Sequence, residues 1–183
     1  MRVSKKDKFV FISTPKCGTN TMFDLVEEHY DATRVTGNYH HTAVPAKYGH
    51  FLKFVICRNP YTRMVSLWMS TTQQAEDRYA LRRNCSGNPD NFTAFVTWVT
   101  STGWPHYLLT TQCSHLQGVR VDTILRLEHL ADDFKVLPFF KGEFPDQKLN
   151  AGYYDYNKIM TVQAKSMIRS WAKCDFERFG YES

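Results

Sequence analysis

Short apolar runs alternate with segments of helical periodicity along the chain. Three of these runs are predicted to form buried strands, because each is brief and carries β-branched or aromatic residues: 9–13 (FVFIS), 51–57 (FLKFVIC) and 121–127 (VDTILRL). The pattern behind each run predicts a helix, beginning near Thr21, at Pro60 and at Glu128. Strands that alternate with helices indicate the α/β class, and we expect a three-layer domain with a mainly parallel central sheet.

The remaining segments are predicted to be irregular or helical. Residues 71–91 are rich in Gln, Arg, Asn and Gly, so we expect an excursion that serves as a lid or contacts the acceptor. An apolar pattern resumes at 92–99, and Asp155 is predicted to cap a last helix that reaches Trp171. A chain of 183 residues suffices for one well-packed domain, so residues 1–183 are expected to form a single domain.

Composition narrows the function classes. The formal charge of +5 is a mild basic bias that suits an anionic ligand, but no block of lysines and arginines supports nucleic-acid binding. The five cysteines include no CxxC pair, which argues against a zinc knuckle or a disulfide framework. The apolar run at 9–12 is too short for a signal peptide or a membrane span, and we expect a cytoplasmic protein without a membrane span.

The loop at residues 13–21 (STPKCGTNT) has the composition of an anion-binding site. Ligands of parallel sheets bind beyond the carboxyl ends of the strands, and this loop joins a predicted strand to a predicted helix. A glycine lets backbone amides approach an anion, a lysine supplies a mobile charge, and the helix N-terminus adds positive potential. The predicted binding residues are Lys16, Cys17, Gly18, Thr19, Asn20 and Thr21.

Two familiar phosphate chemistries do not match this loop. In the nucleotide-binding pattern GxxxxGK[ST] the lysine follows the glycine, whereas Lys16 precedes Gly18, and no acidic residue at a strand end offers a magnesium ligand. A P-loop-like kinase is therefore a less favoured alternative. A phosphatase of the Cys-x5-Arg type is excluded, because Phe23 stands where the arginine would be.

A second anion-binding element follows the next predicted strand. Arg58 stands at the strand's end, and Ser66 lies two turns along the helix that follows. A guanidinium and a hydroxyl in this arrangement can share one phosphate group. Two phosphate sites at neighbouring strand ends suit a ligand that carries phosphates at both ends of its sugar.

PKCGTNT followed by RNPYTRMVS resembles the paired signature of sulfotransferases that use 3′-phosphoadenylyl sulfate (PAPS). The most similar subgroup is the carbohydrate type, heparan 2-O and chondroitin or dermatan sulfotransferases with their bacterial relatives, and the resemblance spans most of the chain. It implies that the first loop holds the 5′-phosphosulfate of PAPS and that the Arg58–Ser66 pair holds the 3′-phosphate. The product would be the bisphosphate PAP, and no metal is required.

The resemblance also implies catalytic residues. Lys16 is expected to stabilise the leaving phosphate, and His41 is expected to be the general base, because His-Thr-Ala ahead of the second strand matches the family. His40 is the alternative base. Some sulfotransferases use a glutamate, for which Glu27 and Glu28 are the weaker candidates.

The sequence thus predicts transfer of a sulfuryl group from PAPS to an acceptor hydroxyl, and we expect this hydroxyl to belong to a glycan or a related metabolite. The alternative from a different class is a non-catalytic module that binds PAP or another nucleotide. The motifs specify neither the acceptor nor the oligomeric state.

Overall fold

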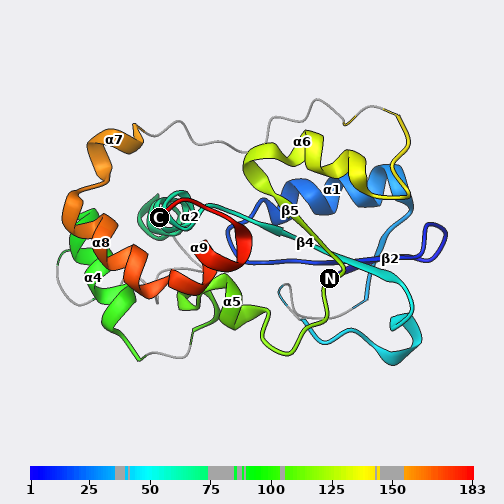
Figure 1. Ribbon diagram of the computed structural model, residues 1–183, viewed down its shortest axis with the longest axis horizontal. Coiled ribbons are helices and arrows are strands. Elements are labelled where there is room, and N and C mark those ends of the chain that lie inside the picture. Colours follow the sequence, from blue (N-terminus) through cyan, green and yellow to red (C-terminus); the bar gives the residue numbers. More distant parts are fainter. Residues whose placement is uncertain are drawn as a thin grey trace. The chain divides into compact units, whose positions relative to one another are not determined.

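The structure is a computed structural model that describes residues 1–35, 40, 42–73, 85, 88, 90–103, 106–142, 144 and 155–183 (Figure 1). It divides into two compact units. The first unit comprises residues 1–58 and 114–152, and the second comprises residues 59–113 and 153–183. The expectation that 1–183 act as one domain stays a prediction, and the predicted excursion at 71–91 falls largely outside the described residues.

The first unit contains a mixed sheet. In the described part of the chain its strands are β1 (Arg2–Ser4), β2 (Phe9–Ile12), β3 (Thr33–Arg34), β4 (Leu52–Cys57) and β5 (Thr123–Arg126), in the order β3-β1-β2-β4-β5. Strands β2, β4 and β5 run parallel, whereas β1 pairs antiparallel with both β2 and β3. The three predicted strands are confirmed and form the parallel centre, so the α/β class is confirmed as well.

The sequence pattern did not predict β1 and β3. Each is too short to show a period, and β1 carries Arg2 and Ser4 beside a single aliphatic residue. Arg2 is nevertheless buried, because its guanidinium lies 3.8 Å from the ring centroid of Phe23 and its Nε donates to Glu27. Tertiary contacts, which a local pattern cannot reveal, therefore bring the basic N-terminal segment into the sheet.

Helices cover one face of this sheet. Helix α1 (Thr19–Tyr30) follows β2, and the segment after β5 forms η3 (Leu127–His129), α6 (Leu130–Asp133) and η4 (Phe134–Val136) (Figure 1). A single helix was predicted from Glu128, and the observed segment is instead broken into these short turns. Apolar residues of α1, α6 and η4 pack with the central strands into one core, which includes Phe11, Met22, Phe54, Leu125 and Phe134.

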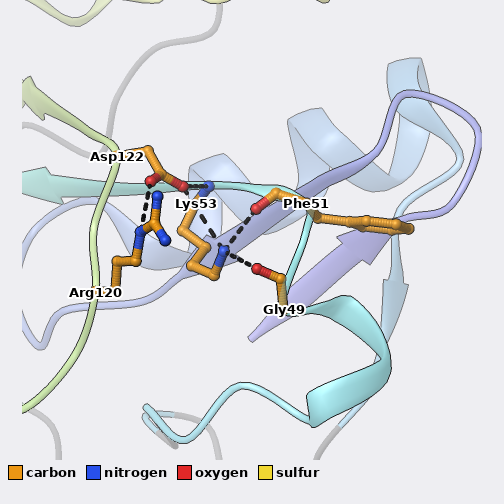
Figure 2. Close-up of polar contacts among 5 residues, drawn as sticks. All are labelled: Gly49, Phe51, Lys53, Arg120 and Asp122. Carbon is orange, nitrogen blue, oxygen red and sulfur yellow. Dashed lines mark hydrogen bonds and ion pairs between the residues drawn. The ribbon is translucent and has the colours of Figure 1, made fainter.

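A buried lysine joins β4 to β5 at their amino ends. Lys53 is 5% exposed, and its Nζ donates to the carbonyl oxygens of Gly49 and Phe51, at 2.7 Å each (Figure 2). Asp122, just before β5, accepts from the Lys53 backbone N–H at 2.8 Å and lies 3.7 Å from its Nζ. Arg120 donates to the same carboxylate at 3.3 Å. These contacts fix the pairing of β4 and β5, whose carboxyl ends carry the candidate site.

The described part of the second unit is helical. Its elements are α2 (Pro60–Gln73), α4 (Phe92–Ser101), η2 (Tyr107–Leu109), α7 (Tyr156–Ile159), α8 (Val162–Trp171) and α9 (Lys173–Phe179), while α5 (Gln112–His115) spans the boundary between the units. Their apolar faces share a second core that includes Met64, Phe95, Ile168 and Phe176. The predicted three-layer arrangement stays a prediction, because these helices belong to a separate unit.

The prediction of one last helix from Asp155 to Trp171 was wrong. The chain forms α7, leaves helical geometry at Met160, and starts again at α8. The side chain of Thr161 accepts from the Ala164 backbone N–H at 3.1 Å and so caps the start of α8. A capping residue inside an apolar stripe therefore divides the helix that the stripe predicted.

Candidate functional site: an anion-binding edge of the sheet

The loop at residues 13–21, called here the anion loop, leaves β2 and turns directly into α1. Ser13 and Thr14 are buried, with exposed fractions of 0% and 1%. Lys16 and Gly18 both adopt a positive φ, of 66° and 74°. A lysine rarely adopts this left-handed conformation, which costs free energy and is found where a tight loop serves a function. The half-buried Lys16 thus has a strained backbone conformation, which is consistent with a role in binding an anion.

Gly18 is required for two separate reasons. Its φ of 74° favours glycine, and a Cβ atom built on it would lie 2.7 Å from Cδ1 of Leu127. Leu127 follows β5 directly, so the segment behind β5 packs against the turn of the anion loop. The glycine that was predicted to let backbone amides approach an anion is therefore also a contact point between two strand ends.

Side chains within the anion loop hold its own backbone. The Thr19 hydroxyl donates to the carbonyl oxygen of Thr14 at 3.0 Å, and the Cys17 thiol donates to that of Pro15 at 3.4 Å. Cys17 is 1% exposed and belongs to the core of the first unit. Its side chain therefore packs inside, and of this residue only the backbone N–H is suited to an anion.

The N-terminus of α1 is open to an anionic ligand. Gly18 is its N-cap and supplies no side-chain hydrogen bond, and the first turn, where Asn20 is exposed and Thr21 is buried, carries no acidic residue. The first backbone N–H groups of a helix have no partner within the helix, and the helix dipole makes this end positive. An oxyanion placed here would accept hydrogen bonds from these groups.

Arg58 comes from the neighbouring strand end and contacts the anion loop. It follows β4, and its Nη1 donates to the carbonyl oxygen of Lys16 at 3.3 Å. The two elements that were predicted separately, the lysine–glycine loop and the arginine, thus lie against each other. The Arg58 guanidinium and the backbone of the anion loop therefore meet at the carboxyl ends of β2 and β4, where a ligand with more than one negative charge would be favoured.

A third basic side chain lies at the same edge. Arg126 ends β5 and pairs in register with Cys57, the residue before Arg58. The Oδ2 atom of Asp133 accepts a hydrogen bond from the Arg126 backbone N–H at 2.8 Å and lies 3.5 Å from the Arg126 Nε. The carboxyl ends of β4 and β5 therefore both carry an arginine.

The predicted partner of Arg58 belongs to the second unit. Ser66 lies on α2 and is half-exposed. Sharing of one phosphate group by Arg58 and Ser66 stays a prediction.

Of the two predicted base histidines, the structure describes one. His41 lies outside the described residues, whereas His40 is described and half-buried. The ring centroid of His40 lies 6.1 Å from that of His115, with the ring planes at 81°. The Nε2 of His115 in turn lies 3.3 Å from the carbonyl oxygen of Ser13. His40 is therefore near the start of the anion loop.

His115 was not among the predicted site residues. Nothing in its local sequence distinguishes it from the other histidines of the chain, and it is separated from Ser13 by 102 positions. Only the contact of His115 with Ser13 in the folded chain reveals it.

The alternative glutamate bases lie at the wrong end of α1. Glu27 and Glu28 come eight and nine positions after Thr19, which places them about 12 Å or more along the helix axis from the anion loop. Glu27 accepts a hydrogen bond from Arg2, and the Oε2 atom of Glu28 lies 3.9 Å from the Nε2 atom of His29. These contacts disfavour both as a base for chemistry at the loop.

The donors gathered at this edge can bind oxyanions, which makes a phosphate or sulfate ester a suitable ligand. Within the part of the chain that the structure describes, no group of three or more metal-ligating side chains is found. Among those same residues, no helix has both the length and the apolar character needed to cross a membrane.

One comparison with known proteins is consistent with a site for a phosphate or sulfate ester. A family model described as the sulfotransferase family matches residues 1–182. Searches of curated proteins and of solved structures returned no match. Because the family match covers nearly the whole sequence, the chain belongs to the sulfotransferase family.

Proposed function

We propose that the protein transfers the sulfuryl group of PAPS to a hydroxyl of a glycan or a related metabolite. Family membership supports sulfuryl transfer in general. The observation that carries the choice of PAPS is the hydrogen bond from Arg58 to the Lys16 carbonyl at 3.3 Å. It brings the arginine behind β4 against the lysine–glycine loop behind β2, which supports a donor with phosphates on both sides of its ribose.

The residues present fit such a donor. Backbone N–H groups from Cys17 to Thr21 and the ammonium of Lys16 are assigned to the 5′-phosphosulfate, beside the open N-terminus of α1. Arg58 and Ser66 are assigned to the 3′-phosphate, for which the planar guanidinium offers two charge-assisted hydrogen bonds. PAPS supplies the sulfuryl group itself.

In the proposed reaction a histidine, His41 or alternatively His40, takes the proton of the acceptor hydroxyl. The acceptor oxygen then forms a bond to sulfur while the bond from sulfur to the bridging phosphate oxygen breaks. Lys16 stabilises the negative charge that develops on the leaving phosphate of PAP. As in phosphoryl transfer, positioning and electrostatic stabilisation provide most of the catalysis.

Binding and turnover together test this proposal. Purified protein is mixed with PAP, with PAPS and with ATP and Mg²⁺, and thermal unfolding is followed. We expect PAP and PAPS to raise the midpoint and ATP with Mg²⁺ to have a smaller effect. Transfer of labelled sulfate from PAPS is then screened over glycans, phenols, lipids and small alcohols. Absence of stabilisation by both PAP and PAPS would contradict the proposal.

The same assay separates the enzyme from a binding module. A module that only holds PAP would bind it tightly, transfer no sulfate, and be indifferent to His41→Ala and His40→Ala. The enzyme should lose about 10²- to 10⁴-fold in rate when its general base is removed. The histidine whose replacement has this effect, with PAP binding retained, is the base.

A further inference from the structure

His115 connects the anion loop to the segment that carries the candidate bases. Its Nε2 lies 3.3 Å from the carbonyl oxygen of Ser13, the first residue of the anion loop. A carbonyl oxygen only accepts hydrogen bonds, so this nitrogen must carry the proton and donate it. The contact places a proton on Nε2 and fixes the orientation of the His115 ring.

The second contact of His115 is with His40. Their ring centroids are 6.1 Å apart and their planes meet at 81°, which is the edge-to-face arrangement that aromatic rings favour. His40 belongs to the connection before β4, whereas His115 ends α5. One imidazole ring thus contacts both the loop assigned to the phosphosulfate and the histidine-bearing connection.

We propose that His115 is a positioning residue, which holds His40 near the start of the anion loop by hydrogen-bonding to Ser13 and packing against the His40 ring. This inference rests on the proposed function, because the position matters only if a base of this connection acts on an acceptor at the loop. Ser13 is completely buried and follows a strand, so it provides a rigid anchor for the ring.

The expected kinetic signature follows from geometry. A displacement of about 1 Å between a catalytic group and its substrate can cost about 10²-fold in rate. Loss of His115 should therefore lower kcat. It should leave the affinity for PAP nearly unchanged, because the groups assigned to the phosphates are the backbone and side chains of other residues.

Three substitutions separate the two contacts. His115→Ala removes both, His115→Phe keeps a ring but loses the donor to Ser13, and His115→Gln keeps an N–H donor but loses the ring. We expect His115→Ala to lower kcat by about 10- to 100-fold, with the Kd of PAP changed by less than about threefold. The kcat values of the Phe and Gln variants should lie between those of the Ala variant and the wild type. These two variants test the inference even if the Ala variant does not fold.

A matched control is available in the same unit. His50 is exposed and packs edge-to-face on Phe51, with ring centroids 4.7 Å apart. It lies two residues before β4, near the amino end of this strand and so away from the site at the carboxyl end. His50→Ala should leave kcat unchanged. The measurements are initial rates of sulfate transfer with varied PAPS and acceptor, and calorimetric titration with PAP.

The outcomes distinguish this inference from the proposed function. If the wild type transfers sulfate and all three variants keep kcat within about twofold, the positioning role is wrong and the sulfotransferase stands. If the variants lose PAP affinity as strongly as kcat, His115 supports the anion loop and does not position the base, which also overturns the inference. If the wild type neither binds PAP nor transfers sulfate, the proposed function fails and this inference fails with it.

Discussion

Leu127 lies so close to Gly18 that a Cβ atom on residue 18 would be 2.7 Å from its Cδ1. The two residues follow β5 and β2, which are not neighbours in the sheet, since β4 lies between them. The segment behind β5 therefore reaches across the end of β4 to the turn of the anion loop. This contact makes the shape of the loop depend on the whole parallel centre of the sheet.

Gly18→Ala should impair both stability and transfer. The left-handed conformation costs alanine about 1–2 kcal/mol, and Leu127 must also move, so we expect the free energy of unfolding to fall by about 1–3 kcal/mol. Gly118→Ala is the control, because Gly118 has a φ of 72° and nothing within 4 Å of the added Cβ. Denaturant unfolding should show a larger loss for Gly18→Ala, and the loss for Gly18→Ala combined with Leu127→Ala should be smaller than the sum of the two single losses. Equal losses at both glycines would mean that the Leu127 contact is unimportant.

Lys16→Ala should abolish most of the transfer while leaving the fold intact. Removing one electrostatic donor from a charge-stabilising site typically costs about 10²- to 10³-fold in rate. The matched control is Lys8→Ala, because Lys8 is an exposed lysine that also has a positive φ, 54° compared with 66° for Lys16. Initial rates with PAPS check the prediction. Activity within threefold of the wild type would remove Lys16 from the catalytic residues.

Arg58→Ala should act mainly on donor binding. Loss of a hydrogen bond to a charged group costs about 1.5–3 kcal/mol, which corresponds to a Kd for PAP raised by about 10- to 150-fold. Arg120→Ala removes the same charge from the opposite edge of the sheet, where the Arg120 side chain is 82% exposed. Calorimetric titration with PAP should find nearly unchanged affinity for this control. If both variants weaken PAP equally, the effect belongs to net charge and not to a specific site.

Asp122 should make stability depend on pH in the acidic range. Burial alone would raise the pKa of Asp122, but the Lys53 N–H and the charges of Lys53 and Arg120 outweigh burial and hold it below the ordinary value of 3.8. The folded state then binds this proton less tightly than the unfolded state does. Its stabilisation is therefore present above pH 3.8 and is lost as the pH falls through the lower, folded-state pKa.

The corresponding variant is Asp122→Asn. At pH 7 we expect the free energy of unfolding to fall by about 1–3 kcal/mol, as for a hydrogen-bonded group that loses its charge, and the difference from the wild type to shrink in acid. Asp132→Asn is the control, because Lys135 lowers the pKa of Asp132 at a fully exposed position, where an ion pair contributes little. Denaturant unfolding measured from pH 7 down to acid tests both variants. A difference that does not depend on pH would contradict the assignment.

The hydrophobic pattern predicted the parallel centre of the sheet because buried strands are marked locally, by short apolar runs. It predicted α1 and α2 because helical periodicity is also a local feature of the sequence. It missed β1 and β3, whose residues are buried by contacts such as that of Arg2 with Phe23. It also joined α7 to α8, because an apolar stripe does not show where a capping threonine interrupts the helix.

The sequence by itself showed a lysine and a glycine behind one strand and an arginine behind the next, and it identified the sulfotransferase family. Residue type and spacing suffice for that, because strand ends and helix starts are local features. Only the tertiary structure decided that Arg58 reaches the Lys16 carbonyl, that Leu127 closes on Gly18, and that His115 joins Ser13 to His40. These contacts join residues far apart in the sequence, and their geometry depends on how every intervening element packs.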